Sequence, residues 1–208
     1  MKKTTVLMAA ALVAAALCAT SARAEVKGGD AKAGAASSNV ACKSMDMVLS
    51  IYEGDIVPAA EAMPADKFDF APSTSTFAAD SKADFTNPKP VMTFAAEVRH
   101  IAEANYMFFT MGGAKPDRDV KAIEDLKSRD EILKALKDSY AFGHKVLNET
   151  SDADALKEIK IFGKPSTPAA AYAFAMAHMG DHYGQMVEYL RMNGVVPPAS
   201  RPKAKNSD

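Results

Sequence analysis

Residues 168–194 read PAAAYAFAMAHMGDHYGQMVEYLRMNG and carry the clearest helical pattern in this chain of 208 residues. The preceding Ser166-Thr167-Pro168 supplies a helix cap and a first-turn proline, and Gly194 is a typical helix stop. We therefore predict a helix over about 168–193. Its inward face should follow the helical spacing of three or four residues and contain Phe174, His178, His182, Gln185 and Tyr189.

Three earlier stretches show the same helical periodicity of apolar residues. The first covers about 40–61, and the second starts near Val91 and ends at Gly112-Gly113. The third opens at Ser128-Arg129-Asp130-Glu131, which has the pattern of a capping box. The residues predicted to face the core are Met45, Val48, Leu49, Tyr52 and Ile56, then Phe94, Val98, Ile101, Asn105 and Phe108, then Leu133, Leu136, Tyr140 and Leu147.

The segments between these helices are of two kinds. Residues 62–90 are rich in proline, serine and threonine and keep no regular period, so we predict a long connection there. Residues 114–127 have the pattern of a second connection with a short helical turn, and we find no alternating stretch long enough for a strand. Four amphipathic helices predict an all-α fold, a four-helix bundle with a long crossover connection after the first helix.

Residues 1–24 have the pattern of a secretory signal peptide. Lys2-Lys3 precedes an unbroken apolar run from Val6 to Cys18, and Ala22-Arg23-Ala24 fits the small-x-small cleavage site. A membrane-spanning helix needs about 20 apolar residues, so this run is too short for an anchor. We therefore expect an exported protein, periplasmic or secreted after cleavage near Ala24.

The remaining chain divides into three parts. Residues 25–38 are small, polar and rich in glycine, which predicts a disordered leader. Residues 39–198 are predicted to form the bundle domain, and residues 199–208 a disordered tail. Cys18 leaves with the signal, so Cys42 remains alone and no intramolecular disulfide can form. The role of Cys42 stays open.

The charge balance excludes one class of partner. The whole chain has a formal net charge of −1 at pH 7, and the predicted signal removes basic residues only. An acidic balance of this size gives no support for nucleic-acid binding. No later segment is apolar enough and long enough to span a membrane. A small-molecule substrate and a homodimer both stay open.

The chain has only four histidines, His100, His144, His178 and His182. His178 and His182 are four apart on the predicted last helix, which places their Cβ atoms about 5–6 Å apart on one face. Two imidazoles at that spacing can ligate one metal ion. A buried polar group without a partner costs about 1–3 kcal/mol, and a shared metal ion supplies the partner. The alternative is a pair of histidines that only packs or faces solvent.

His100 extends this pair to a three-histidine site. It lies on the predicted second helix, beside the apolar stripe and on the same face as Glu97. Three histidine ligands leave an open position for water, which is typical of catalytic rather than structural sites. Glu97, Asp181 and Gln185 are candidates to orient the ligands or a bound water. His144 on the third helix either approaches the site or serves the core.

Two familiar metal motifs do not fit. A metalloprotease of the His-Glu-x-x-His type needs glutamate directly after the first histidine, and that position is Met179. A di-iron bundle needs two Glu-x-x-His segments, and Glu97-Val98-Arg99-His100 supplies only one. The acid expected three residues before the other histidines is Ala175 in one case and Met179 in the other. Three imidazoles suit several divalent transition metals, with zinc our first choice and nickel the second.

Two stretches resemble the DinB-like superfamily. Residues 178–198, HMGDHYGQMVEYLRMNGVVPP, resemble the last helix of these proteins, and residues 94–106, FAAEVRHIAEANY, resemble an earlier helix. The resemblance extends over about 40–198. It implies a four-helix bundle with a long crossover and a metal ion held by three histidines, which in this chain are His100, His178 and His182.

The resemblance also implies a range of activities. Members with assigned activities include thiol S-transferases, a thiol-dependent isomerase and proteins assigned as metal-dependent hydrolases. In that chemistry the metal lowers the pKa of a bound thiol or water and makes a nucleophile at neutral pH. Our first hypothesis is a metal-dependent hydrolase or transferase with an open water position. The alternative is a non-catalytic metal- or ligand-binding bundle outside the cytoplasm, with Glu97 or His144 filling that position.

Overall fold

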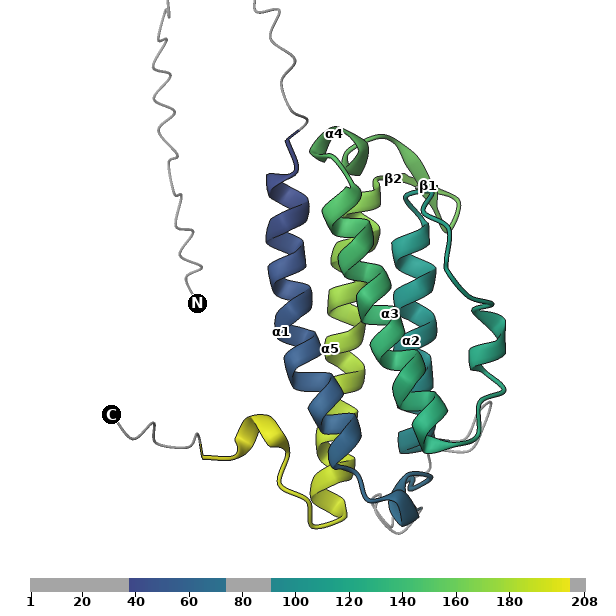
Figure 1. Cartoon of the computed structure of the whole chain (residues 1–208), viewed down its shortest axis with the longest axis vertical. Helices are drawn as coiled ribbons and strands as arrows, with labels where there is room; N and C mark the ends of the chain where they lie inside the picture. The colour runs from purple at the N-terminus through teal and green to yellow at the C-terminus, as the bar shows by residue number, and fades with distance from the viewer. Residues whose placement is uncertain (1–37, 74–90, 203–208) are drawn as a thin grey trace, which may run out of the picture. The chain divides into compact units, whose positions relative to one another are not determined.

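A computed structural model describes residues 38–73 and 91–202 of the chain. Within these ranges the chain forms an all-α bundle (Figure 1), which confirms the predicted fold class. The four long helices are α1 (Val40–Ala62), α2 (Phe94–Thr110), α3 (Arg129–Glu149) and α5 (Pro168–Met192). The predicted signal peptide, nearly all of the predicted leader and residues 203–208 of the predicted tail lie outside the described residues.

Three of the long helices begin at a hydroxyl cap. In each case the side chain accepts a hydrogen bond from the backbone amide three residues on: Thr93 before α2, Ser128 before α3 and Thr167 before α5. Each cap satisfies one of the amides that the first helical turn leaves without a partner. The predicted starts of α3 and α5 are therefore confirmed. The second helix begins at Phe94, slightly later than predicted from Val91, because Thr93 is its cap.

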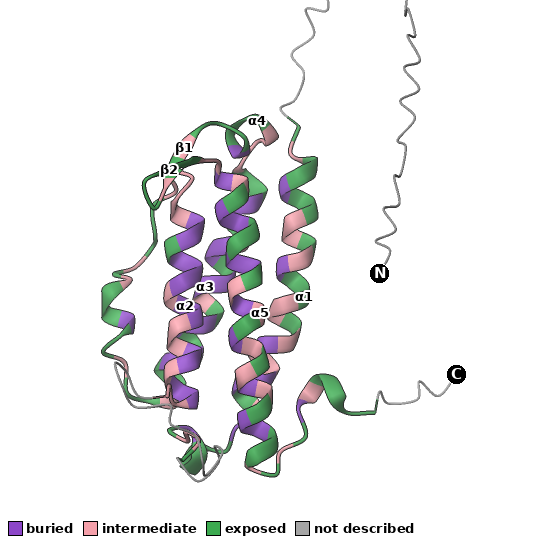
Figure 2. Cartoon of the chain, turned by 180° about the vertical axis from the view of Figure 1, so that it is seen from behind, coloured by how far each residue is buried: buried purple, intermediate pink, exposed green. Residues whose placement is uncertain are grey.

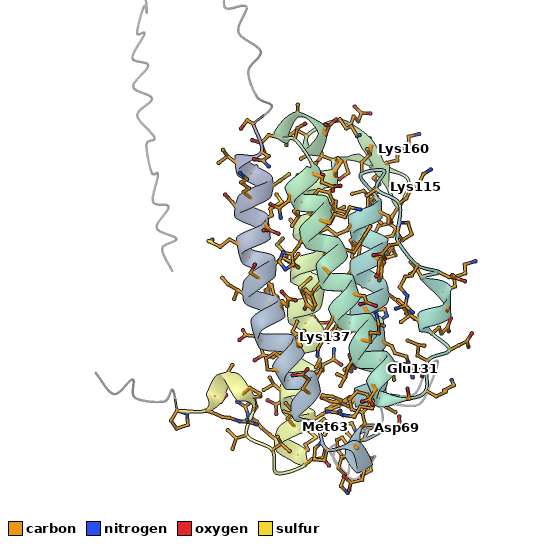
Figure 3. The ribbon with its side chains drawn as sticks, in the orientation of Figure 1. Met63, Asp69, Lys115, Glu131, Lys137 and Lys160 are labelled. Carbon is orange, nitrogen blue, oxygen red and sulfur yellow. The ribbon has the colours of Figure 1, made fainter. Side chains whose placement is uncertain are left out.

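Each long helix packs against two others, in the order α1, α3, α2 and α5 around the bundle. Arg129 and Lys137, in the first half of α3, contact Glu61 at the end of α1. Figure 3 labels Lys137 on α3 and Met63 just beyond the end of α1. At the opposite end, Asp152 just after α3 accepts hydrogen bonds from the amides at the start of α1. The helices α1 and α3 are therefore antiparallel, whereas α2 and α3 run in the same direction (Figure 1).

The connections follow from these directions. The connection after α1 is long, as predicted, and residues 74–90 of it lie outside the described part of the chain. Its described residues Phe68 and Phe70 accept backbone hydrogen bonds from the start of α2. This connection joins two helices that run in opposite directions, so the crossover predicted after the first helix instead follows α2 (Figure 1). Residues 111–128, which we call the crossover segment, run back along the bundle from the end of α2 to the start of α3 (Figure 1). A connection of this length is needed because the two helices it joins are parallel. It contains the short helical turn that we predicted, Lys121–Ile123.

Short elements complete the end of the bundle between α3 and α5. A four-residue helix, α4 (Asp152–Ala155), is followed by the antiparallel strands β1 (Ile159–Ile161) and β2 (Lys164–Ser166). The turn between the strands has Phe162 at φ 49° and Gly163 at φ 79°, as a two-residue hairpin with the natural strand twist requires. The sequence does not predict this hairpin, because three-residue strands are too short for an alternating pattern to show.

The core lies between the four long helices, whose inward faces are buried along their length (Figure 2). All of the core residues predicted for α2 and α3 are buried. On α1 the prediction holds for Leu49 and Ile56, whereas the other three are half-buried. None of the described helices has the length and apolar character needed to cross a membrane.

The predicted inward face of α5 was partly wrong. Phe174 is 52% exposed, and the residues that fill the core are Ala175, Met176, Met179 and Met186. The buried face of α5 is rotated relative to the predicted one because α5 packs on both α1 and α2. The small and flexible side chains of α5 therefore occupy the narrow space between those two helices. Phe174 lies at the margin of the helix, where its ring meets Phe108 of α2 edge to face.

Candidate metal centre

Three histidine side chains meet between α2 and α5. The Nε2 atom of His178 lies 3.2 Å from Nε2 of His100 and 3.3 Å from Nε2 of His182. One ring nitrogen from each histidine lies within 4.8 Å of the other two. Within the described ranges, no further histidine, cysteine or carboxylate joins this group. The structure therefore brings together the three histidines that the sequence nominates as ligands.

The antiparallel packing of α2 and α5 places these histidines at one level. At one end of the helix pair, the Tyr189 hydroxyl donates a hydrogen bond to the carbonyl of Met92. At the other end, the rings of Phe108 and Phe174 have centroids 5.0 Å apart. His100 lies midway along α2 between these contacts, so it falls level with the His178–His182 turn of α5.

The spacing of the three nitrogens suits a metal ion. Zinc–nitrogen bonds of about 2.0–2.1 Å in a tetrahedral arrangement separate the ligand atoms by about 3.3–3.4 Å, close to the two distances observed here. Hydrogen bonding among the rings satisfies the same geometry only in part. Nε2 of His178 faces both neighbours, and a ring nitrogen carries at most one hydrogen. A cation that accepts three lone pairs satisfies all three nitrogens together.

Glu97 supports one of these imidazoles from the buried side. It lies on α2 with an exposed fraction of 0%, and its Oε2 accepts a hydrogen bond of 2.5 Å from Nδ1 of His182. A carboxylate in that place keeps the proton on Nδ1 and leaves the Nε2 lone pair directed at the other two histidines. Of the three residues nominated to orient the ligands, Glu97 is the one that the structure places against a histidine.

The other carboxylate oxygen of Glu97 gives a second indication that these residues fit a bound metal ion. Oε1 is buried and has no hydrogen-bond partner among the described residues. A buried carboxylate costs several kcal/mol unless positive charge lies close to it. A divalent cation at the three nitrogens supplies that charge through the His182 ring. The carboxylate and the histidine cluster therefore both fit a bound metal ion.

The histidines are suited to binding as neutral rings. Burial, together with the neighbouring His182 and His100, lowers the pKa of His178 to about 4. At neutral pH its lone pair is therefore free of a competing proton. His182 is 8% exposed, whereas His100 and His178 are half-buried. The cluster is thus closed at His182 and accessible from the side of the other two histidines.

Asp181 and Gln185 have a weaker relation to the cluster. Asp181 is exposed on α5, and its charge acts on His178 without a hydrogen bond, in the direction that raises the His178 pKa. Gln185 is half-buried. In the described part of the chain, no hydrogen bond joins either side chain to a histidine. Their adjacency to the ligands in sequence therefore does not bring them into contact with the rings.

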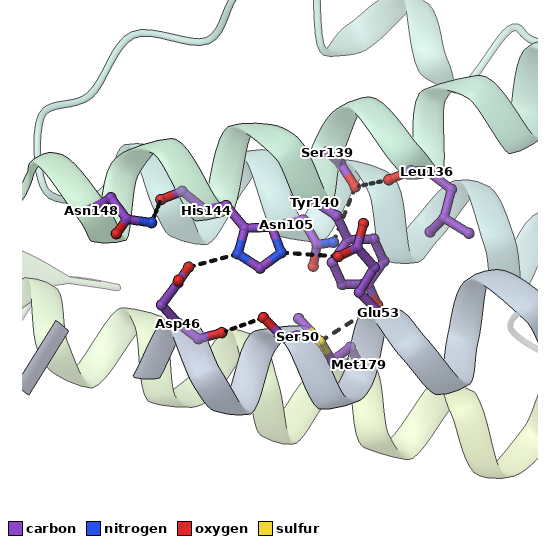
Figure 4. A network of polar contacts seen from close by, with 10 residues as sticks. All are labelled: Asp46, Ser50, Glu53, Asn105, Leu136, Ser139, Tyr140, His144, Asn148 and Met179. Atoms are coloured by element: carbon purple, nitrogen blue, oxygen red, sulfur yellow. Dashed lines mark hydrogen bonds and ion pairs between the residues drawn. The ribbon is translucent and has the colours of Figure 1, made fainter. Parts of the chain in front are cut away.

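His144 lies apart from the other histidines. It projects from α3 between two carboxylates of α1, with Nδ1 2.6 Å from Asp46 and Nε2 3.0 Å from Glu53 (Figure 4). Burial lowers the pKa of His144, but the hydrogen bonds with Asp46 and Glu53 outweigh it, so the net shift is upward. This arrangement links two helices and leaves neither ring nitrogen for a metal ion. The two acids lie two helical turns apart on α1, and this spacing is the only signal in the sequence that could have predicted the pairing.

Cys42, whose role the sequence left open, lies buried at the start of α1. Burial and the nearby Asp152 raise the pKa of its thiol. A thiol with a raised pKa carries little of the reactive thiolate at neutral pH. Cys42 therefore serves the core and not the chemistry of the site.

A groove adjoins the histidine cluster on its accessible side. A cavity of about 440 Å³ lies between α2 and the crossover segment and is lined by His100, Glu103, Ala104, Met107, Val120, Lys121 and Glu124. A second cavity of about 230 Å³ also includes His100. A larger cavity of about 610 Å³ lies between the crossover segment and α3 but contains none of the histidines. The sequence does not predict the groove, because one wall comes from a connection without a regular pattern.

Comparison with known proteins agrees with this arrangement. Residues 53–186 match the DinB superfamily, which is more than half of the chain. A DinB-like protein from Bacillus cereus is similar in structure, with a TM-score of 0.62 and 15% identity over 75% of this chain and 95% of that one. A DinB-like protein from Bacillus subtilis gives a TM-score of 0.56 and 16% identity over 77% and 99%. Identities this low show only that the fold is shared. A search of curated proteins found no match to this chain. The chain belongs to the DinB superfamily.

Proposed function

We propose that this protein binds one divalent transition metal ion through His100, His178 and His182, and that it is a metal-dependent hydrolase or transferase. The observation that carries the proposal is the convergence of three Nε2 atoms at separations of 3.2 and 3.3 Å, the spacing expected of ligands to one ion. Membership of the DinB superfamily supports metal binding. Three imidazoles without a thiolate favour zinc first and nickel second.

The surrounding residues support chemistry at this position. A bound divalent ion supplies Lewis acidity and lowers the pKa of a coordinated water or thiol towards neutrality. Glu97 fixes the orientation of His182 through Nδ1. The Phe108 ring lies edge to face against His178, with centroids 5.7 Å apart, and shields that side of the cluster from water. Access remains along the half-buried edges of His100 and His178.

The alternative function, a non-catalytic metal-binding bundle, needs a protein group in the remaining coordination position. Neither candidate for that group lies at the three converging nitrogens. Glu97 is bonded to the opposite nitrogen of His182, and His144 is held by Asp46 and Glu53. The geometry therefore favours a site with an open position. An exchangeable water in the cobalt-substituted protein supports the enzyme, and a fourth protein ligand supports the alternative.

We also propose that the protein acts outside the cytoplasm, on the basis of the signal-peptide pattern of residues 1–24. Hydrolysis is then favoured over thiol transfer, since water is present in every compartment. Sequencing the N-terminus of protein expressed with residues 1–24 and recovered from the periplasm or the medium tests this location. We expect the recovered chain to begin just after Ala24. Full-length protein confined to the cytoplasm would contradict it.

Elemental analysis of purified protein tests the metal site. We expect about one metal ion per chain in the unaltered protein and a large loss in His178→Ala. The matched control is His144→Ala, which removes a histidine that lies outside the cluster and should keep the metal. Equal metal content in the unaltered protein and His178→Ala, or equal loss in both variants, overturns the proposal.

A further inference from the structure

We infer that the groove formed by Ala104, Met107 and Val120 binds the aliphatic chain of a ligand whose polar head occupies the open position at the histidine cluster. The inference rests on the proposed function and adds the substrate class: a molecule with an aliphatic chain next to a metal-binding group. Three observations support the inference: the groove borders the histidine cluster, the groove has an apolar lining, and other side chains cover the remaining sides of the cluster.

The position of the groove links it to the cluster. His100 supplies one of the converging nitrogens and also lines the 440 Å³ cavity. Ala104 and Met107 follow His100 by one and two turns along α2, and Val120 faces them from the crossover segment. A ligand held at the cluster therefore meets apolar side chains as it extends along α2 past His100.

The other sides of the cluster are occupied. His182 is 8% exposed and backed by the fully buried Glu97. Phe108 and Phe174 lie against His178, with ring centroids 5.7 and 6.4 Å from that of His178.

The half-buried edge of His100 borders the groove. His100 also lines the smaller cavity of about 230 Å³, which contains Arg99. The groove with Ala104, Met107 and Val120 is the larger of the two and the one with the apolar lining, so we assign it to the part of the ligand beyond the head group.

The lining of the groove selects an apolar chain. Ala104 is small and 4% exposed, so it leaves room at the base of the groove, whereas Met107 is 43% exposed at its edge. Methionine is flexible and adapts to chains of different shape. The lining also contains Lys121, Glu103 and Glu124, whose charges are of both signs and give no strong single-sign field. The volume lies within the range of small-molecule sites.

A series of alkyl hydroxamates tests the inference, because the hydroxamate head chelates a metal ion while the chain length varies. The binding of acetohydroxamate, butanohydroxamate, hexanohydroxamate and octanohydroxamate to zinc-loaded protein is measured by calorimetry. We expect affinity to rise by up to about fourfold for each methylene buried. In Ala104→Phe, which fills the groove, this rise should vanish while acetohydroxamate binds as before.

Two further variants make the test decisive. Ala141→Phe places the same ring on an exposed position of α3 that lines none of these cavities, and it should keep the full dependence on chain length. Met107→Gln preserves side-chain volume at a partly exposed position where folding is not at risk, and it should reduce the gain per methylene.

The outcomes separate the two proposals. If acetohydroxamate binds but longer chains bind no more tightly, or if Ala104→Phe and Met107→Gln both keep the full dependence, the apolar groove is wrong and the metal site stands. If acetohydroxamate does not bind zinc-loaded protein, the open metal position fails and the inference falls with it.

Discussion

Glu97 and His182 are joined across the α2–α5 interface by a hydrogen bond of 2.5 Å between Oε2 and Nδ1. The bond is buried, and it fixes which nitrogen of His182 faces the other two histidines. A carboxylate behind a histidine ligand raises the basicity of the ring and holds its orientation. The metal affinity of the cluster should therefore depend on a residue that is not itself one of the three proposed ligands.

Replacing Glu97 by glutamine should weaken metal binding by about 10- to 100-fold, because the neutral amide no longer supports the His182 ring as a carboxylate does. Competition with a chelator of known affinity measures the change. The control is Asp181→Asn, which removes an exposed acid beside the ligands and should alter the affinity little. Equal affinities for Glu97→Gln and the unaltered protein would contradict the role of this carboxylate.

Removing the metal should lower the melting temperature. An ion that binds only the folded state adds stability by mass action, about 2.7 kcal/mol when free metal is at 100 times its dissociation constant. Thermal unfolding with and without a strong chelator measures the effect. We expect a clear downward shift for the unaltered protein and for His144→Ala, and none for His178→Ala. A chelator shift of the same size in His178→Ala would place the metal elsewhere.

The hydrogen bonds of His144 with Asp46 and Glu53 should make the free energy of unfolding depend on pH. Since the pKa of His144 is raised in the folded state, its stabilisation is fully present below the unfolded value of 6.5 and is lost as pH rises through the raised value. The stability difference between the unaltered protein and His144→Gln should therefore shrink as the pH rises above 6.5. Urea unfolding across this range measures it. The reasoning fails if the difference grows with pH.

Replacing Gly143 and Gly184 by alanine should change the stability of the bundle in opposite directions. A Cβ at Gly143 would lie 2.7 Å from Phe109 and 3.0 Å from Leu49, so Gly143→Ala should destabilise the bundle by about 1–3 kcal/mol through overpacking. A Cβ at Gly184 meets nothing within 4 Å, so Gly184→Ala should stabilise α5 by about 0.5–1 kcal/mol through helix propensity. Denaturant unfolding compares them. Stabilisation by both would show that α3 does not pack closely on α1 and α2.

The sequence predicts the helices well because local chemistry defines them. Thr167-Pro168 and the Ser128–Glu131 box start α5 and α3 with their own side chains, and the apolar spacing of α2 matches its buried face. The pairing of His178 with His182 also follows from spacing within one helix. These features need no knowledge of what packs against the helix.

The features that the sequence does not predict depend on tertiary contacts. The rotation of Phe174 out of the core depends on how α5 fits between α1 and α2. The bond from Glu97 to His182 spans two helices, and sequence reasoning could nominate Glu97 only through its place beside His100. The pairing of His144 with Asp46 and Glu53 likewise depends on α1 lying against α3.

The parallel direction of α2 and α3 has a further consequence for the groove beside the histidine cluster. The crossover segment that joins them supplies one wall of the groove, with Val120, Lys121 and Glu124, yet none of the three histidines and none of the four long helices. The groove therefore takes one wall from α2, which carries His100, and the other from a segment that carries none of the proposed metal ligands. A substitution within residues 111–128 can therefore change the lining of the groove without replacing a proposed metal ligand.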